Sequence, residues 1–459
     1  MRADQLRGVL VAALTSAAVV IGPGIGSAAL GSPTSNGSAA SGPGSVLWTS
    51  VRDGDGHAVA ADPRGGMVFV AGSTGLVAYD SGTGAKVWEN GAGSGRSVAV
   101  SPEGHVVFVI KPIRATGGTW DFSTAAFDTA TGKPLWARHY NGRANGDDRP
   151  AALAVSPGGS TVFVTGTSQG KTSGRDYATV AYSALTGKQL WASRYNGHGR
   201  GADIAVAMTV SPRGGAVFVT GTSSGRNSGS DFATVAYAAA TGASLWTKRY
   251  DQANRLDAAS SVAASPDGRR VFVTGASDGR RFGLDFATVA YAAATGSPLW
   301  VRRYHAPADR DDMPVAVLVS PRGGGTVVVS GGSRGNGNND YVSVGYSTLT
   351  GRTRWVSRFH RDFQPEFPEA AAISPDGRSF YLTGSVFPGG GGGEEPADAL
   401  TVAAKIATGA VSWSNVVTPT SHDAIGRSVA VSPDSGTVYI VLQNFTTVAK
   451  DFATVAFKA

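Results

Sequence analysis

The sequence predicts an all-β protein, a single eight-bladed β-propeller with four antiparallel strands in each blade. Three observations carry this prediction. The chain repeats itself about every fifty residues; each repeat holds four short strand-like runs; and the two ends of the chain complete one another. The propeller is expected to occupy residues 45–459 of the 459-residue chain.

One stretch of sequence recurs three times almost unchanged and ends each time in Trp. The copies end at Trp191, Trp246 and Trp300, so the steps are 246 − 191 = 55 and 300 − 246 = 54 residues. A period of this length is typical of propeller blades or solenoid repeats. A second anchor, a Pro that follows Ser or Asp and precedes a Gly-rich turn, occurs eight times. Its copies are Pro63, Pro102, Pro157, Pro212, Pro266, Pro321, Pro375 and Pro433.

Each repeat contains four runs rich in Val, Phe, Tyr and Thr, separated by Ser-Pro, Gly-rich and Thr-Gly turns. In the copy around Pro212 the runs are 205–210, 216–220, 232–237 and 244–250. Beyond the first 30 residues no apolar period of 3.6 residues is sustained, so no helix is predicted. Four strands per repeat define a propeller blade.

The two ends of the repeat array supply the argument for closure. The last repeat passes through Asp451 and Phe457 and stops without its Trp-containing strand. Near the beginning of the chain, the segment 46–48 ends in Trp48 and is an isolated copy of that strand. We expect the two to pair, because an unpaired strand edge invites aggregation.

Eight of the nine Trp residues occur once per predicted blade, each shortly after a Gly. We interpret these indoles as packing against the neighbouring blade, where each buries up to ~250 Å². A ring of stacking platforms for sugars or bases is the alternative. It is disfavoured because the spacing places these residues in outer strands, away from the channel. They are Trp48, Trp88, Trp136, Trp191, Trp246, Trp300, Trp355 and Trp413.

The beginning of the chain has the pattern of a secretory signal peptide, assigned to residues 1–29. Arg2 and Arg7 precede an apolar run over 8–21, and small residues follow. The run is shorter than the ~20 residues that span a bilayer, and no second candidate span occurs. We therefore expect a secreted protein with no membrane span in its mature form, although an uncleaved anchor is the alternative. Residues 30–44 read as a disordered Gly/Ser/Pro linker.

Composition excludes several kinds of chemistry. The chain has no Cys, which rules out disulfides, thiolate metal sites and Cys nucleophiles. The net charge is +7, and the sequence has no run of consecutive basic residues. We therefore interpret the charged residues as a solvated surface and expect no nucleic-acid partner. Nucleic-acid binding would require a basic face on one side. We expect a monomer.

The sequence also resembles a known family. The segment 126–132 with Trp136 is similar to the tryptophan-docking motif of quinoprotein-like eight-bladed propellers. These include pyrroloquinoline quinone (PQQ) dehydrogenases and the BamB-type outer-membrane assembly lipoprotein. The segments 194–197 and 140–142 resemble bacterial SBBP-type β-propeller repeats. The resemblance covers nearly all of residues 45–459 and implies the fold, whereas propellers host many activities.

The chain departs from both named branches. The alcohol dehydrogenases resemble a pattern with adjacent Cys residues near the quinone, and this chain has none. No segment matches their Ca²⁺ ligands or catalytic Asp, so PQQ is not expected as a cofactor. The chain also lacks the Cys that would carry the lipid of a BamB-type lipoprotein.

Propeller ligands usually meet the loops where the inner strands begin. Eight residues before the Ser of each anchor, five consecutive blades carry a carboxylate. If these face the channel mouth they form a partial acidic ring, which suits a hard cation such as Ca²⁺. A structural alternative is favoured, in which each carboxylate fixes its own turn through a backbone N–H. The five residues are Asp148, Asp203, Asp257, Asp312 and Glu366.

Two breaks in the repeat symmetry add candidates for binding or catalysis. His305 precedes Asp312 in blade six, and His360 precedes Glu366 in blade seven. A His beside carboxylates can act as a general base or bind a metal, but neither group has a recognisable ligand spacing. A solvated loop His is the simpler interpretation. The run 389–393, followed by Glu394 and Glu395, is read as a flexible hairpin tip.

Two functions remain open. The first is a secreted binding or scaffold propeller whose loops engage a protein, a glycan or a cell-envelope component. The second is an enzyme at the central channel, a lyase, hydrolase or quinone-dependent oxidoreductase that uses the carboxylates and His of blades three to seven. Carboxylates clustered with His305 or His360 would favour the enzyme, and carboxylates bonded to their own loops would favour the scaffold.

Overall fold

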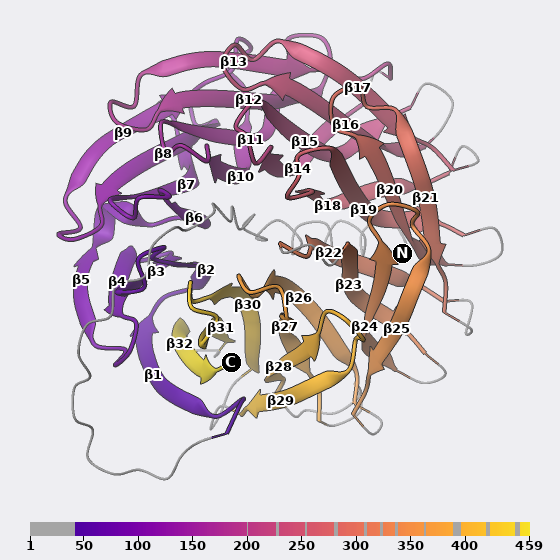
Figure 1. The fold of residues 1–459 in the computed structure, drawn as a ribbon. Coiled ribbons are helices and arrows are strands. Elements are labelled where there is room, and N and C mark those ends of the chain that lie inside the picture. The colour runs from indigo at the N-terminus through magenta and orange to yellow at the C-terminus, as the bar shows by residue number, and fades with distance from the viewer. Residues whose placement is uncertain are drawn as a thin grey trace.

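The computed structural model confirms the predicted fold, a ring of eight four-stranded antiparallel sheets around a central axis (Figure 1). It describes residues 42–199, 201–225, 229–252, 255–279, 283–306, 310–321, 325–335, 338–361, 364–388, 396–418, 423–445 and 450–459. The predicted signal peptide, most of the predicted linker and the run 389–393 with Glu394 and Glu395 lie outside these residues. The blades are numbered one to eight in the order of their inner strands.

The strands of the first four blades follow one another along the chain. Blade one contains β2 (Gly56–Ala61), β3 (Met67–Gly72), β4 (Leu76–Asp80) and β5 (Lys86–Asn90). A short 3₁₀ helix, η2 (Gly91–Gly93), leads to blade two with β6 (Ser97–Val100), β7 (Val106–Arg114), β8 (Trp120–Asp128) and β9 (Pro134–Tyr140). Blade three contains β10 (Asp148–Val155), β11 (Thr161–Gln169), β12 (Arg175–Ser183) and β13 (Gln189–Tyr195). Blade four contains β14 (Asp203–Val210), β15 (Ala216–Ser224), β16 (Ser230–Ala238) and β17 (Ser244–Tyr250).

The remaining blades repeat this order until the last. Blade five contains β18 (Asp257–Ala264), β19 (Arg270–Asp278), β20 (Leu284–Ala292) and β21 (Pro298–Tyr304). Blade six contains β22 (Asp312–Val319), β23 (Thr326–Arg334), β24 (Asn339–Ser347) and β25 (Thr353–Phe359). Blade seven contains β26 (Glu366–Ile373), β27 (Ser379–Val386), β28 (Asp398–Lys405) and β29 (Val411–Val417). Blade eight contains β30 (Asp423–Val431), β31 (Thr437–Phe445) and β32 (Lys450–Lys458), and its outer strand is β1 (Val46–Asp53).

The ring closes as predicted, through the two ends of the chain. Strand β1 pairs antiparallel with β32, from Val46 opposite Phe457 to Asp53 opposite Asp451. Figure 1 shows the indigo β1 lying beside the yellow β32. Every blade therefore has four strands, and closure gives β32 a partner strand on both of its edges.

The hydrophobic core lies between blades. Each of the eight clusters of buried apolar side chains combines residues from two adjacent blades. One cluster, for example, joins Phe163 and Trp191 of blade three to Val219 and Tyr237 of blade four. A blade cannot bury its own faces, so stability depends on the neighbour on each side, as in other repeat proteins.

The repeated Trp residues connect blade to blade, as the sequence predicts. The indole N–H of Trp191 donates to the carbonyl of Ala239 in the next blade at 2.9 Å, and Trp246 does the same to Ala293 at 2.8 Å. In seven of the eight blades, the Trp ring lies on the Gly of the next blade's Thr-Gly turn. Gly242 there has φ +71°, and a Cβ on it would lie 2.5 Å from the Trp191 ring. The Gly after each Thr is therefore required by its backbone conformation and by the close indole.

The linkers between blades lie on one face of the disk, hereafter called the linker face. Each runs from the end of one blade's outer strand to the start of the next blade's inner strand, and the Ser-Pro and Thr-Gly turns lie on the opposite face. The candidate residues are located on the linker face. Among the described residues, no helix is long and apolar enough to cross a membrane.

Candidate functional site

The five predicted carboxylates occupy one equivalent position. Each is the first residue of an inner strand, in β10, β14, β18, β22 or β26. Their side chains are nevertheless buried, with at most 1% of any of the five residues exposed. They are Asp148, Asp203, Asp257, Asp312 and Glu366. A carboxylate this deeply buried requires hydrogen bonds or a cation as partners.

Each carboxylate accepts a hydrogen bond from a backbone N–H in its own linker. The Gly197 N–H donates to Asp203 at 2.6 Å, the Gln252 N–H to Asp257 at 2.7 Å, and the Ala306 N–H to Asp312 at 2.7 Å. Gly142 N–H donates to Asp148 at 2.5 Å and Arg361 N–H to Glu366 at 2.6 Å. This is the turn-fixing role that the sequence analysis favoured, and it holds each linker against the start of the next blade.

A second layer of polar groups surrounds each carboxylate, and blade four shows it completely. The Ser223 hydroxyl donates to Asp203 at 2.5 Å, and Arg249 donates to the same hydroxyl at 2.5 Å. Arg249 also forms an ion pair with Asp231 at 2.5 Å and reaches the Tyr195 hydroxyl of blade three at 3.3 Å. One guanidinium therefore connects three strands of its own blade to the outer strand of the preceding one.

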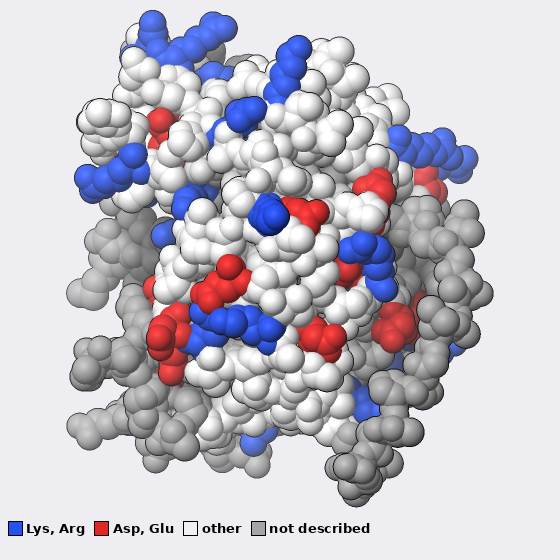
Figure 2. Space-filling view, turned by 90° about the vertical axis from the view of Figure 1, so that its left-hand side faces the viewer, with Lys and Arg blue, Asp and Glu red and all other residues white. Residues whose placement is uncertain are grey.

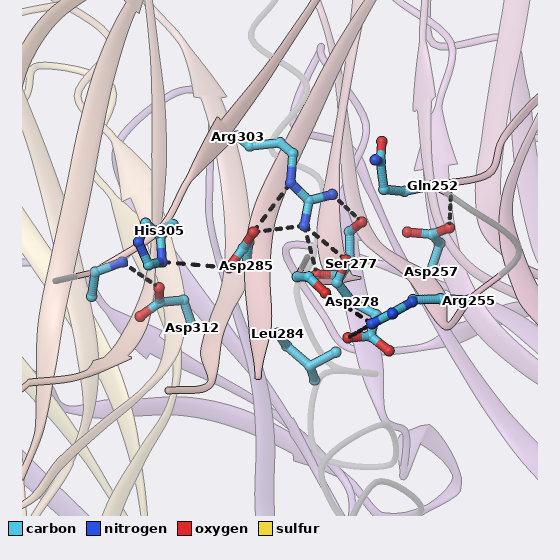
Figure 3. A network of polar contacts seen from close by, with 12 residues as sticks. Gln252, Arg255, Asp257, Ser277, Asp278, Leu284, Asp285, Arg303, His305 and Asp312 are labelled. Atoms are coloured by element: carbon cyan, nitrogen blue, oxygen red, sulfur yellow. Dashed lines mark hydrogen bonds and ion pairs between the residues drawn. The ribbon is translucent and has the colours of Figure 1, made fainter. Parts of the chain in front are cut away.

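The same arrangement recurs in the flanking blades. Arg303 of blade five pairs with Asp285 at 2.7 Å and donates to Ser277 at 2.5 Å (Figure 3). It also donates to the Tyr250 hydroxyl at 3.2 Å. Arg194 pairs with Asp176 at 2.8 Å in blade three, and Arg358 pairs with Asp340 in blade six. Blade seven has Val416 opposite Leu400 at the corresponding place in its outer strand and no such Arg.

Gly is required in two of the linkers because a larger residue would not fit. A Cβ on Gly197 would lie 2.7 Å from the Asp203 carboxylate and 3.1 Å from the Arg249 guanidinium. Gly142 has the corresponding place over Asp148 and Arg194 in blade three. The Asn-Gly sequence after Tyr140 and Tyr195 therefore lets the linker backbone approach the polar network closely.

Burial shifts the ionisation of these carboxyl groups. Desolvation raises the pKa of Asp257 to about 6 and that of Glu366 to about 8. Desolvation also raises the pKa values of Asp148, Asp203 and Asp312. A buried carboxyl is harder to charge because the interior solvates the anion poorly, and the backbone N–H bonds offset only part of that cost.

The structure brings each carboxylate near the preceding blade rather than into a shared cluster. Asp312 lies with Asp285 and His305, and Asp257 lies with Asp231 and Asp251, with one ligand atom from each within 4.8 Å of the others. Neither of these groups, found among the described residues, contains two of the five carboxylates. Carboxylates of neighbouring blades also raise the pKa values of Asp203, through Asp176, and of Glu366, through Asp340.

The two predicted His residues are both exposed, and each follows the outer strand of its blade. His305 Nδ1 lies 3.9 Å from Asp285 Oδ1, with about half of its side chain exposed (51%). It is drawn beside Asp285 and Asp312 in Figure 3. His360 occupies the equivalent position in the next linker. His305 therefore has the geometry of a group near two carboxylates, whereas the structure gives His360 a surface position.

Cation binding is chemically compatible with these groups but competes with Arg. Three carboxylates, as in Asp231, Asp251 and Asp257, are the oxygen ligands that Ca²⁺ prefers. The group with His305 has a mixed donor set that suits a transition metal. In each, one carboxylate already pairs with a guanidinium, Arg249 on Asp231 and Arg303 on Asp285. A cation would have to bind beside that positive charge.

The Arg and third-strand Asp residues are functional neighbours that the sequence reasoning missed. Their signal was present, because Asp176, Asp231 and Asp285 open three nearly identical stretches and an Arg-Tyr pair closes each. Candidate residues were sought only before the inner strands, so these partners were missed. Strand pairing alone brings the two positions together, with Ala233 opposite Arg249 and Ser223 opposite Asp231.

These features define a closed eight-bladed β-propeller of the PQQ-like type. The chain belongs to the family described as outer membrane protein assembly factor BamB, whose model matches residues 38–228 and 230–456. No curated protein sequence matches the chain.

Solved structures share the fold at low sequence identity. Chaetomium thermophilum Sqt1, bound to the N-terminus of the ribosomal protein L10, has a TM-score of 0.56 at 12% identity and covers 88% of this chain and 97% of its own. Quinohemoprotein alcohol dehydrogenase from Comamonas testosteroni has a TM-score of 0.56 at 13% identity, with 90% and 76% covered. Kuenenia stuttgartiensis hydrazine synthase has a TM-score of 0.50 at 14% identity, with 72% and 92% covered. Identities this low show the fold alone.

The linker face of blades three to six does not fit the quinone of the alcohol dehydrogenases. PQQ carries three carboxylates and needs cations or N–H donors to hold them. On the linker face the guanidinium groups of Arg194, Arg249, Arg303 and Arg358 already face Asp carboxylates. The inner-strand starts add further buried carboxyl groups, which disfavour a trianionic ligand.

Proposed function

We propose that the protein is an exported binding or scaffold propeller, which engages a protein, glycan or cell-envelope partner through its linker face. The carboxylates of blades three to seven fix the linkers, and the side chains that project from those linkers form the contact surface. Family membership and the fold shared with a propeller bound to the N-terminus of a ribosomal protein support a binding role.

One observation carries this proposal. In five successive linkers, the residue that follows the outer strand is exposed, while the carboxylate a few residues later is buried and bonded to the linker backbone. The exposed position is Asn in two linkers, Asp in one and His in two, whereas the anchor is acidic in all five. A rigid frame with changing exposed side chains is the design of a recognition surface. The exposed residues are Asn141, Asn196, Asp251, His305 and His360.

An enzyme at the central channel is the second candidate, and the group of Asp285, His305 and Asp312 favours it. Clustered carboxylates with an imidazole can supply general acid–base catalysis. Both carboxylates, however, already have structural partners, since Asp312 accepts from the Ala306 N–H and Asp285 pairs with Arg303. The binding role therefore has the stronger support.

The partner class follows from charge as well. On the face drawn in Figure 2, basic and acidic side chains are interspersed and do not form one basic patch. Nucleic acid would require a continuous positive surface. This side of the rim gives no support to a nucleic-acid partner, and we keep protein, glycan and cell-envelope components as the proposed partners.

A pair of matched variants tests the proposal. The linker variant replaces the five exposed linker residues by Ala. The control variant replaces five exposed residues of the opposite face by Ala, namely Glu103, Lys133, Lys188, Arg213 and Arg269. Immobilised protein is incubated with a cell-envelope fraction, untreated or digested with a protease or a glycosidase. We expect the wild type and the control variant to retain a component that the linker variant retains at least about tenfold less.

The melting temperature of all three proteins must agree for this comparison to count. Equal retention by the linker variant and the wild type would contradict the proposal. The digestion that abolishes retention identifies the partner as protein or glycan. Export is tested separately, by sequencing the N-terminus of the protein recovered outside the cells, where we expect cleavage near Ala29.

A further inference from the structure

Blade two departs from the other blades at its inner edge. Strand β6 pairs with β7 only from Ser97 opposite Ile110 to Val100 opposite Val107. Strand β7 continues for four more residues, to Arg114, and these pair with β8 alone. Among the described residues, no other backbone hydrogen bond reaches 111–114 from outside β8. One side of this strand segment is therefore left without a neighbouring strand.

The other blades with a long second strand cover it fully. In blade three, β10 pairs with β11 as far as Asp148 opposite Ser168, which corresponds to Ile113 in β7. In blade eight, β30 likewise pairs to the end of β31, with Asp423 opposite Phe445. In blade one the inner strand β2 and the second strand β3 are both short and end together, with Gly56 opposite Gly72. Blade two alone, within the part of the chain that the structure describes, combines a short inner strand with a long second strand.

The cause is visible in the spacing of the two repeat anchors. From Trp88 to Pro102 the chain advances 102 − 88 = 14 residues, whereas from Trp136 to Pro157 it advances 157 − 136 = 21. The linker into blade two is therefore seven residues shorter, and it lacks the segment that would form the first half of an inner strand. The position of the usual carboxylate is taken by Gly93.

The uncovered segment carries positive charge. Lys111 stands where blade three has Gly166. Its ammonium donates to the neutral Ser94 hydroxyl at 2.7 Å and, among the described residues, forms no ion pair within 4.0 Å. Burial lowers the pKa of Lys111, because the half-buried ammonium lacks a carboxylate nearby. Arg114 at the end of the segment is exposed, and so is Arg96 at the start of β6.

The acidic residues of this region lie in β8 and in the linker into blade three, not along the free edge of β7. Asp147 accepts from the Trp120 N–H at 3.1 Å and pairs with Arg149. Asp121 interacts with Asp148 across the blade interface. The guanidinium groups of Arg114 and Arg149 lie 5.2 and 5.0 Å from the Trp120 ring. The edge of β7 itself therefore presents cations and backbone groups.

We propose that the free edge of β7 at residues 111–114 binds an extended acidic segment of a partner protein, which adds to blade two as the missing half of its inner strand. Adding a strand to an exposed sheet edge is a common mode of peptide recognition, in which backbone hydrogen bonds supply affinity and side-chain contacts supply specificity. A four-residue segment spans roughly 13 Å at the usual rise of a strand. Lys111 and Arg114 are three residues apart and project from opposite faces of β7, so the segment needs a carboxylate on each of its two faces to meet both cations.

The positive charge of the β7 edge and its Pro112 together restrict which strand can pair with it. A second copy of this chain would bring Lys111 and Arg114 against their own like charges, which disfavours pairing between copies. Pro112 lacks an N–H, as is typical of edge strands, and it removes one bond from the ladder. An acidic strand avoids the charge repulsion, because its carboxylates attract the cations.

This inference rests on the proposed binding function and assigns it a partner segment. The probe is a labelled eight-residue peptide, Asp-Asp-Val-Val repeated twice and called the Asp-Val peptide, which has carboxylates on both faces of a strand and is titrated against the purified protein by fluorescence anisotropy. The comparison peptides are the same sequence with Lys in place of Asp, the uncharged sequence of residues 30–41, and the Asp-Val peptide with every second backbone nitrogen methylated. Methylation leaves the charge intact and removes the N–H groups of one strand edge.

We expect the Asp-Val peptide to bind and the three comparison peptides to bind at least about tenfold more weakly. Lys111→Glu and the exposed Arg114→Glu should each weaken the Asp-Val peptide by about tenfold or more. Lys133→Glu, the same charge change at the opposite end of blade two, should leave its affinity unchanged. The Arg114 variant keeps the test valid if Lys111→Glu lowers the melting temperature.

Three results would overturn the inference. They are no binding of the Asp-Val peptide, equal binding by the methylated peptide, and tighter binding of the 30–41 sequence, which would make this edge a site for the chain's own N-terminal segment. The envelope-retention assay separates this failure from that of the proposed function. Retention that depends on the linker residues but is unchanged in Arg114→Glu would leave the binding function in place without this site.

Discussion

The indole of Trp413 lies on Gly44, two positions before the ring-closing strand β1 begins to pair with β32 at Val46. A Cβ on Gly44 would come within 2.9 Å of that ring, and the Gly44 N–H donates to the Lys458 carbonyl at 2.8 Å. Gly44 therefore does for blade eight what the Thr-Gly turns do for the other blades. It falls in the segment predicted as a linker, yet it completes the last contact between blades.

Replacing Gly44 by Ala should destabilise the protein by about 1–3 kcal/mol, because φ of +80° is unfavourable for Ala and its Cβ meets the indole. Urea unfolding measures this loss. Gly42→Ala is the matched control, since a Cβ there has no atom within 4 Å. Equal stability of the two variants would show that Gly44 is not part of the closure.

Removing residues 1–53 should lower the melting temperature and cause self-association, because it deletes β1 and exposes the edge of β32. Light scattering and thermal unfolding check both effects. A synthetic peptide of residues 42–53 added in excess should raise the melting temperature of the truncated protein by mass action. If the truncated protein stayed monomeric and ignored the peptide, the role of β1 in closure would be lost.

Arg249→Met should cost about 2–4 kcal/mol of stability, because it leaves the buried Asp231 carboxylate without its cation and breaks bonds to Ser223 and Tyr195. Chemical unfolding is the measurement. Lys248→Met on the same strand, whose side chain lies on the opposite face of the sheet, is the control and should change stability little. A loss of similar size in both variants would argue against a specific role of the guanidinium.

Stability should fall as the pH rises from about 4.5 to 8, in part because burial raises the pKa of Glu366 to about 8. In that range the folded protein keeps a proton that the unfolded chain has released, so each unit of pH favours unfolding. Glu366→Gln keeps an acceptor for the Arg361 N–H and removes this dependence. It should gain about 2 kcal/mol over the wild type between pH 5 and pH 8.

Unfolding experiments at several pH values test this, with the exposed Glu103→Gln as control. A stability difference between Glu366→Gln and the wild type that stays constant with pH would contradict a raised pKa in the folded state.

Calcium should leave the melting temperature unchanged within about 1 °C, whether Ca²⁺ or a chelator is added. The guanidinium of Arg249 already pairs with Asp231 in the acidic group of Asp231, Asp251 and Asp257. A clear rise with Ca²⁺ that Asp251→Asn abolishes would instead establish a cation site there.

The repeat spacing was enough to predict the ring, because each turn and each Trp imposes the same geometry in every blade. The strand ends were harder to predict. The run 216–220 is part of β15, which continues to Ser224, since backbone pairing extends beyond the apolar residues into Thr222 and Ser223. Apolar pattern alone marks where a strand is buried and does not mark where its ladder ends.

The position of the carboxylates was predictable and their surroundings were not. Counting residues finds Asp203 at the start of an inner strand, but its burial depends on Arg249, which approaches from the outer strand of the same blade. Such a contact is set by how four strands stack, which a linear count does not contain. The short inner strand of blade two did leave a trace, in the reduced distance from Trp88 to Pro102.

The pairing of β1 with β32 also has a consequence for synthesis. The partner of Val51 is Ala453, so the first strand to leave the ribosome waits for almost the whole chain before its ladder can form. Contacts between residues this distant in sequence are slow to form. Blades one to seven can assemble on one another in the meantime, and the final strand then joins the two ends in a single late step. Conditions that stall translation near the last repeat should therefore leave an open arc that a protease can cut at both ends.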